Sequence, residues 1–217
     1  MIKVETCLSN CAVDKYERIL FRIHEEEINI AMYERNIDAL KKDVDTLLND
    51  DFEYRANGSA KEIIESLEGD FKSYFDGPSD LLQDIANNVE LFFRTTESAS
   101  FNLYLATINS NMCRRFHTDM NDMRMLCTYS GPGTLWLGED NINREALYGT
   151  GENDTIVLND NEIQQAKTGA VVLLKGALYP KEGTKAIVHR SPTIEESGER
   201  RLLLRIDTND HLGYLLK

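Results

Sequence analysis

A histidine and an aspartate separated by one residue are the first side chains in this sequence whose types and spacing suggest chemistry. His117 and Asp119 flank Thr118, and in an extended segment residues i and i+2 point to the same face. An imidazole and a carboxylate on one face offer two ligands to a divalent metal ion. With a distant second histidine they would form the two-histidine, one-carboxylate set typical of non-haem Fe(II) sites. The alternative is a surface pair on a loop.

The second histidine of such a set is His189. It follows the β-rich run 185–188 and lies far along the chain from His117. This separation suits a barrel in which the third metal ligand returns on a late strand. The alternative is a structural histidine beside Arg190 and Ser191.

The last predicted strand, 201–207, carries arginines on one face. Arg201, Leu203 and Arg205 share that face, and the apolar residues between them share the other. An arginine inside a barrel needs an anion, because an unpaired buried charge is costly. Its planar fork matches a carboxylate, such as that of a 2-oxo acid cosubstrate. A salt bridge with Asp207 or another acid, or exposure at a sheet edge, is the alternative.

The elements that must position these side chains change in character near residue 98. Before it, apolar residues recur at helical spacing, with Ser59 and Ser79 or Asp80 as N-cap residues. Two β-rich pieces precede the helices. The predicted strands are 19–23 and 28–32, and the predicted helices are 35–49, 59–69 and 79–92.

After residue 98 short strands alternate with turn signals such as Gly131-Pro132-Gly133. The predicted strands are 101–106, 123–129, 134–137, 155–158, 170–174, 185–189 and 201–207. The polar segment 138–153 is expected to be a long loop that contacts substrate. This pattern indicates an α+β fold with an antiparallel barrel or sandwich. We expect one compact domain, with a mainly helical region 1–97 packed on a barrel of residues 98–217.

Composition excludes several classes of protein. The 217 residues include 37 acidic and 24 basic ones, which gives a formal net charge of −13. Such a charge opposes binding to nucleic acid or to an anionic membrane. No apolar run is long enough to span a membrane, and the N-terminus lacks the features of a secretory signal. A soluble cytoplasmic protein is therefore expected.

The four cysteines suggest a second kind of metal site. Cys7, Cys11, Cys113 and Cys127 are too few for a disulfide scaffold, so thiols are expected. Cys7 with Cys11, and Cys113 with His117, are pairs of ligands that favour zinc. A non-catalytic zinc-binding or zinc-responsive barrel is therefore the alternative function. Against it, Cys113 and Cys127 also suit buried positions of strands.

Taken together, the motifs resemble the 2-oxoglutarate/Fe(II) dioxygenase superfamily, and more closely one bacterial family, domain of unknown function 1826. The resemblance covers nearly the whole chain. It is carried by Cys113-Arg114-Arg115-Phe116-His117-Thr118-Asp119, by segment 124–137, by Gly169-Ala170-Val171-Val172-Leu173-Leu174-Lys175-Gly176, by His189-Arg190-Ser191-Pro192 and by Arg201-Leu202-Leu203-Leu204. Two residues depart from the family pattern, which usually has proline at Arg114 and an acidic residue at Leu135.

The resemblance implies a double-stranded β-helix, that is, a jelly-roll or cupin-like barrel, with Fe(II) and 2-oxoglutarate as cofactors. It maps the catalytic metal ligands onto His117, Asp119 and His189. It also implies that Arg201 binds the cosubstrate carboxylate. Arg200 is the rival, because Gly198-Glu199-Arg200 also fits the superfamily's Gly-x-Arg spacing. Adjacent strand residues face opposite ways, so the two assignments exclude each other.

The resemblance leaves the substrate open, and a small molecule or a peptide is expected. Three further residues of the segment after Asp119 are candidates for lining the cosubstrate pocket: Arg124, Thr128 and Tyr129. The tyrosine would hydrogen-bond a carboxylate, or else be an ordinary strand aromatic. Trp136 is expected in the core or the pocket wall.

Overall fold

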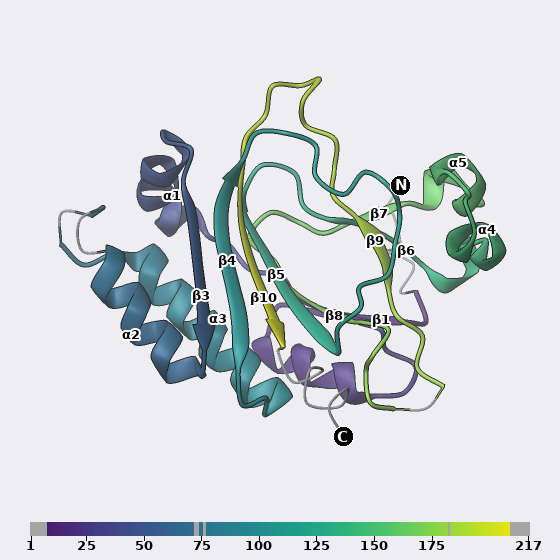
Figure 1. Ribbon diagram of the computed structural model, residues 1–217, viewed down its shortest axis with the longest axis horizontal. Coiled ribbons are helices and arrows are strands. Elements are labelled where there is room, and N and C mark those ends of the chain that lie inside the picture. Colours follow the sequence, from purple (N-terminus) through teal and green to yellow (C-terminus); the bar gives the residue numbers. More distant parts are fainter. Residues whose placement is uncertain (1–7, 72–73, 76, 182, 209–217) are drawn as a thin grey trace.

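The computed structural model describes residues 8–71, 74–75, 77–181 and 183–208 (Figure 1). Its strands are β1 (Cys11–Asp14), β2 (Ile30–Tyr33), β3 (Glu53–Gly58), β4 (Phe101–Ile108), β5 (Met123–Ser130), β6 (Leu135–Leu137), β7 (Gln164–Gln165), β8 (Val171–Lys175), β9 (Val188–Arg190) and β10 (Arg201–Thr208). Its helices are η1 (Glu17–His24), η2 (Asp38–Leu40), α1 (Lys41–Leu48), α2 (Ala60–Asp70), α3 (Asp80–Thr96), η4 (Glu139–Asn141), α4 (Arg144–Tyr148), α5 (Asn153–Ile156) and η5 (Asp160–Glu162).

The strands form two sheets. The larger has seven strands in the order β1-β2-β8-β5-β10-β4-β3, and the smaller has the order β7-β6-β9. All pairs are antiparallel except β1 with β2. Alternation along each central strand therefore sends one set of side chains to each face of the large sheet.

Each face of the large sheet has its own core. On one face, Leu202, Leu204 and Ile206 of β10 pack against apolar residues of α2 and α3, which form a helical layer over the sheet. Leu203, between them, instead packs with Trp136 and other residues between the two sheets. Figure 1 shows α2 and α3 on one side of the large sheet and the small sheet on the other. The molecule thus has a helical layer, a large sheet and a small sheet.

Most predicted elements are present. The helices over 35–49, 59–69 and 79–92 correspond to η2 with α1, to α2 and to α3. Ser59 caps α2 by accepting a hydrogen bond from the Glu62 N–H, and Ser79 caps α3 through the Leu82 N–H. The strands predicted after residue 98 are confirmed as β4, β5, β6, β8, β9 and β10, with 155–158 the exception.

Two predicted strands are wrong. Residues 19–23 lie in η1, where Ile19, Leu20 and Ile23 are buried along one side at helical spacing. Residues 155–158 were expected to be extended, but α5 covers Asn153–Ile156. The Asn153 side chain accepts a hydrogen bond from the Phe116 N–H and donates one to the Arg114 carbonyl. These contacts outweigh the weak β-preference of a four-residue segment.

The region before residue 98 also contributes strands to the large sheet. The predicted strand 28–32 is present as β2 and pairs with β8, whereas β3, which the sequence did not reveal, pairs with β4. The expected loop 138–153 contains η4 and α4. Among the described residues, no helix is both long and apolar enough to cross a membrane.

Candidate metal centre

The connection between β4 and β5 brings His117 and Asp119 to the small sheet. His117 and His189 exchange two backbone hydrogen bonds, each 3.0 Å from nitrogen to oxygen, in an isolated β-bridge. The Ala177 N–H donates to the Asp119 carbonyl at 2.8 Å. Two segments far apart in the sequence are therefore fixed side by side by main-chain contacts before any ligand is considered.

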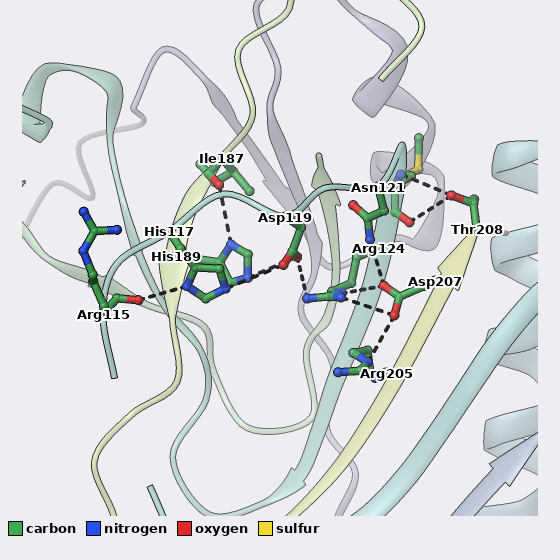
Figure 2. A network of polar contacts seen from close by, with 11 residues as sticks. Arg115, His117, Asp119, Asn121, Arg124, Ile187, His189, Arg205, Asp207 and Thr208 are labelled. Atoms are coloured by element: carbon green, nitrogen blue, oxygen red, sulfur yellow. Dashed lines mark hydrogen bonds and ion pairs between the residues drawn. The ribbon is translucent and has the colours of Figure 1, made fainter. Parts of the chain in front are cut away.

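The side chains of His117, Asp119 and His189 converge (Figure 2). Their potential ligand atoms all lie within 4.8 Å of one another. The Nε2 atom of His189 is 3.3 Å from Asp119 Oδ2, and that of His117 is 3.6 Å from Asp119 Oδ1. Nδ1 of His117 lies 2.9 Å from the Arg115 carbonyl oxygen, and Nδ1 of His189 lies 3.5 Å from that of Ile187. Each ring can therefore donate from Nδ1 and present Nε2 as a ligand.

Burial and charge suit these residues to a cation. His189 is 4% exposed, and burial lowers the pKa of its imidazole to about 4. Burial alone would raise the pKa of Asp119, but the hydrogen bond from His117 and the charges of His189 and Arg124 hold it well below its usual range. The hydrogen bond to Asp119 raises the pKa of His117. At neutral pH the set therefore holds a carboxylate and a neutral buried imidazole.

Arg124 joins this cluster to β10. Its Nη1 atom is 2.5 Å from Asp119 Oδ2, and its Nε atom is 2.5 Å from Asp207 Oδ1. Asn121 also donates to Asp207 Oδ1, at 2.9 Å (Figure 2). The expectation that Arg124 binds a cosubstrate is corrected, because its guanidinium is held between two carboxylates. It orients Asp119 instead.

Arg201 lies on the face of β10 that looks towards the small sheet. It is 1% exposed, and burial lowers the pKa of its guanidinium to about 10. Its Nη2 atom donates to Thr128 Oγ1 at 3.2 Å, while its Nε atom has no hydrogen-bond partner. No carboxylate in the described part of the chain forms an ion pair with Arg201. The alternative of a salt bridge with Asp207 is therefore wrong for Arg201, but it is confirmed for Arg205 on the same face, whose Nε atom lies 3.1 Å from Asp207 Oδ2.

The backbone turn beside Arg201 requires glycine. Gly131 has a φ of +79°, and a Cβ atom there would lie 2.7 Å from Arg201 Cγ. The glycine lets the turn after β5 pass close to the arginine stem. The same turn contains the predicted Gly131-Pro132-Gly133 sequence, which thus positions Arg201 as well as ending a strand.

Two other candidate residues face away from the space between the two sheets. Arg200 lies at the surface, where its Nη2 atom is 2.9 Å from Asp51 Oδ1. Tyr129 is on the opposite face of β5 from Thr128 and donates its hydroxyl to Asp84 of α3 at 2.7 Å. The expectation that Tyr129 contacts a cosubstrate carboxylate is thus corrected, since the carboxylate that it contacts belongs to the protein.

Sequence reasoning missed the part played by Asp207 and only partly placed Trp136. Asp207 lies two residues after Arg205 and therefore on the same face of β10. The alternation along this strand could thus have placed Asp207 on the face of the candidate site. Trp136 is the cross-strand neighbour of His189. It is buried, as expected for a core or pocket-wall residue, and its indole N–H has no hydrogen-bond partner in the described part of the chain.

None of the three cysteines in the described part of the chain belongs to the cluster. Cys113 is exposed, and Cys127 is buried on the helical side of β5, both as free thiols. Cys11 is buried at the start of β1, and Cys7 lies outside the described residues. Among the described residues, the one group of three or more metal-ligating side chains consists of His117, Asp119 and His189.

Comparison with known proteins identifies the family. The profile described as "Protein of unknown function (DUF1826)" matches residues 14–207. The chain belongs to this family. No curated protein matches.

Solved structures of oxygenases are among the similar folds. The dioxygenase for auxin oxidation 1 of Arabidopsis thaliana, solved with 2-oxoglutarate, is 6% identical with a TM-score of 0.46, over 91% of each chain. A prolyl-4-hydroxylase of Pseudomonas putida is 10% identical with a TM-score of 0.45, over 88% of this chain and 93% of that one.

Proposed function

We propose that this protein is a non-haem Fe(II)- and 2-oxoglutarate-dependent oxygenase of the hydroxylase type. The observation that carries the proposal is the convergence of His117, Asp119 and His189 within 4.8 Å, on segments held together by main-chain hydrogen bonds. Two imidazoles and one carboxylate leave further coordination positions for a cosubstrate and oxygen. This donor set fits Fe(II), and Fe(II) with 2-oxoglutarate would supply the oxidising chemistry.

The strand order supports a double-stranded β-helix. The large sheet contains β8-β5-β10-β4, and the small sheet, extended by the His117 bridge, runs β7-β6-β9 and then His117. Apart from β6 and β7, which pair within the small sheet, successive strands from β4 onwards thus pass back and forth between two facing sheets, as in a jelly roll. This arrangement would place the metal ligands between the sheets.

Arg201 supports 2-oxoglutarate as the cosubstrate. It is a buried cation without a carboxylate partner in the described residues, and Thr128 shares its side of the sheet. An unpaired buried guanidinium is costly, and a carboxylate offers it a bidentate partner. The fork of Arg201 and the hydroxyl of Thr128 would hold the carboxylate remote from the metal. Arg124 would hold Asp119 in one orientation.

The competing proposal of a non-catalytic zinc protein lacks a supporting observation. The cluster contains no thiolate ligand, and thiolates are what would favour zinc over Fe(II). The substrate, which we propose to be a small molecule or a peptide, would enter beside the metal.

The test measures cosubstrate use directly. Purified protein is given Fe(II), oxygen and 2-oxoglutarate, and succinate is quantified; anaerobic visible spectra with Fe(II) report cosubstrate chelation. His189→Ala should abolish both signals. Arg201→Gln should weaken 2-oxoglutarate binding by about 10- to 100-fold while metal binding persists, because a charge-assisted hydrogen-bond pair is lost.

Arg200→Gln is the matched control, since this neighbouring arginine faces the surface. It should leave cosubstrate binding unchanged. Wild-type protein that binds metal but yields neither succinate nor a spectral change with 2-oxoglutarate would contradict the proposal. So would equal effects of the Arg200 and Arg201 substitutions.

A further inference from the structure

A polar recess lies on the large sheet beside the candidate metal centre. It has a volume of about 340 Å³, and its walls come from β3, β4 and β10. We propose that this recess binds the carboxylate group of a small organic acid, with Arg205 as its principal partner. The inference rests on the proposed function, since it assigns the recess to the substrate of that oxygenase.

Strand register builds the recess from two rows of side chains. Arg55 of β3, Tyr104 of β4 and Arg205 of β10 are direct cross-strand neighbours. The next row along the strands is Asn57, Asn102 and Asp207. Directly paired residues of antiparallel strands share a face, so all six side chains belong to the face that also bears Arg201.

The first row presents guanidinium groups with unused hydrogen-bond donors. The Arg55 and Arg205 guanidinium carbons lie 4.3 Å and 5.1 Å from the centre of the Tyr104 ring. Arg205 is 30% exposed, and its Nε atom is 3.1 Å from Asp207 Oδ2. Among the described residues its two Nη atoms contact no acceptor. The tyrosine ring and the aspartate therefore fix an arginine whose outer edge remains available.

The second row adds neutral hydrogen-bonding groups. No described residue forms a side-chain hydrogen bond with Asn57 or Asn102, both of which line the recess. Amide nitrogens can donate to an anion without adding charge. The recess thus offers a planar fork flanked by neutral donors.

Charge selects the class of ligand. The lining contains two arginines and one aspartate, in a chain whose formal net charge is −13. Each arginine already has one carboxylate beside it, Glu53 at 2.8 Å from Arg55 and Asp207 at 3.1 Å from Arg205. A phosphate dianion would be repelled by these carboxylates more strongly than a ligand with a single negative charge. A planar carboxylate matches the two terminal nitrogens of Arg205 in bidentate geometry. We therefore assign a monocarboxylate rather than a phosphate ester.

The recess is connected to the metal centre by a short chain of ion pairs. Asp207 lines the recess and contacts Arg124, which contacts Asp119 (Figure 2). Only one guanidinium group therefore separates the recess wall from a candidate metal ligand. An acid anchored at Arg205 would have the rest of its skeleton within reach of the metal.

The experiment compares two probes that differ only in charge. Fluorine NMR line broadening is recorded for 4-fluorobenzoate and for neutral 4-fluorobenzamide with the full chain, in chelator to exclude coordination by metal. We expect broadening with the acid but not with the amide. Arg205→Gln should weaken acid binding by about tenfold, because a charge-assisted bidentate contact is lost. Circular dichroism checks that the variant is folded.

Two further variants locate the acid. Arg55→Gln should weaken its binding, and Arg201→Gln should not. Loss of binding in Arg201→Gln with retention in Arg205→Gln would overturn the proposal, as would equal binding of acid and amide or no binding to the wild type. Because probe binding requires neither Fe(II) nor 2-oxoglutarate, this result is independent of the succinate assay, and either proposal can fail alone.

Discussion

One guanidinium group determines how the candidate metal ligands are presented. Arg124 lies between Asp119 and Asp207, and all three side chains are partly buried. A buried cation that serves two carboxylates neutralises their mutual repulsion and limits their rotation. Residues that orient metal ligands in this way affect metal affinity although they do not touch the metal.

Replacing Arg124 by methionine should reduce affinity for Fe(II) or Co(II) by about 10- to 100-fold. It should also lower the free energy of unfolding by about 3 kcal/mol, because two partly buried carboxylates lose the guanidinium that they share. Calorimetric titration with Co(II) and urea unfolding provide the two measurements. Arg144→Met, which removes a partly buried ion pair with Glu139, is the control for metal affinity. Unchanged Co(II) affinity in the Arg124 variant would refute the orienting role.

Helix α3 is attached to the large sheet by a polar network as well as by apolar contacts. Asp84 of α3 forms an ion pair with Arg35 and accepts hydrogen bonds from Tyr129 at 2.7 Å and from Asn88 at 3.1 Å. Arg35 also donates to the Gly169 carbonyl at 3.0 Å. The network joins the helix to β5 and to the turn before β8, and it explains why Tyr129 does not face the metal.

Asp84→Ala should destabilise the fold by about 3 kcal/mol, because it leaves the partly buried Arg35 cation without a carboxylate partner. Tyr129→Phe removes one hydrogen bond and should cost about 1 kcal/mol. Urea unfolding curves for both variants test these values. If Tyr129→Phe instead reduced 2-oxoglutarate binding, the tyrosine would have the cosubstrate role that its position argues against. Asp80→Ala, on the first turn of the same helix, is the control.

Stability across the whole molecule should depend on pH through a buried lysine. Lys175 at the end of β8 is almost fully buried, with Nζ donating to the Glu25 carbonyl at 2.8 Å and lying 4.6 Å from the Tyr179 ring centre. Burial lowers the pKa of its ammonium group from 10.5 to about 8. The Lys175 amine binds a proton more tightly in the unfolded chain than in the folded one. Burying the charged ammonium group therefore lowers the free energy of unfolding by its full amount below pH 8, and this destabilisation vanishes above pH 10.5.

Lys175→Met should therefore stabilise the protein more at pH 7 than at pH 10, with a difference of about 1 to 2 kcal/mol after allowance for solvent screening. Urea unfolding of both proteins at the two pH values gives this difference, and effects of other titrating groups cancel. The exposed Lys61 of α2 provides the control, as Lys61→Met. A gain that is identical at pH 7 and pH 10 would show that Lys175 keeps its ordinary pKa.

The local spacing of apolar and capping residues was sufficient to predict most helices and strands, but not all of them. Helical spacing with Ser59 and Ser79 as caps located α2 and α3, and alternation located β4 and β10. The pattern failed at η1 and α5, where short segments take their conformation from the residues packed against them. The exposed face of β3 gave no apolar alternation strong enough to distinguish it from a loop.

The sequence alone determined the types of side chain available for chemistry and the face that each would occupy. The spacing of His117 and Asp119, and the alternation that separates Arg201 from Arg200, follow from covalent geometry and from strand period. Tertiary structure decided which of these groups meet. The bridge to His189, the capture of Arg124 by two carboxylates and the absence of a described carboxylate partner for Arg201 depend on contacts between distant segments. Such contacts are set by how the sheets pack and register, and no local pattern encodes them.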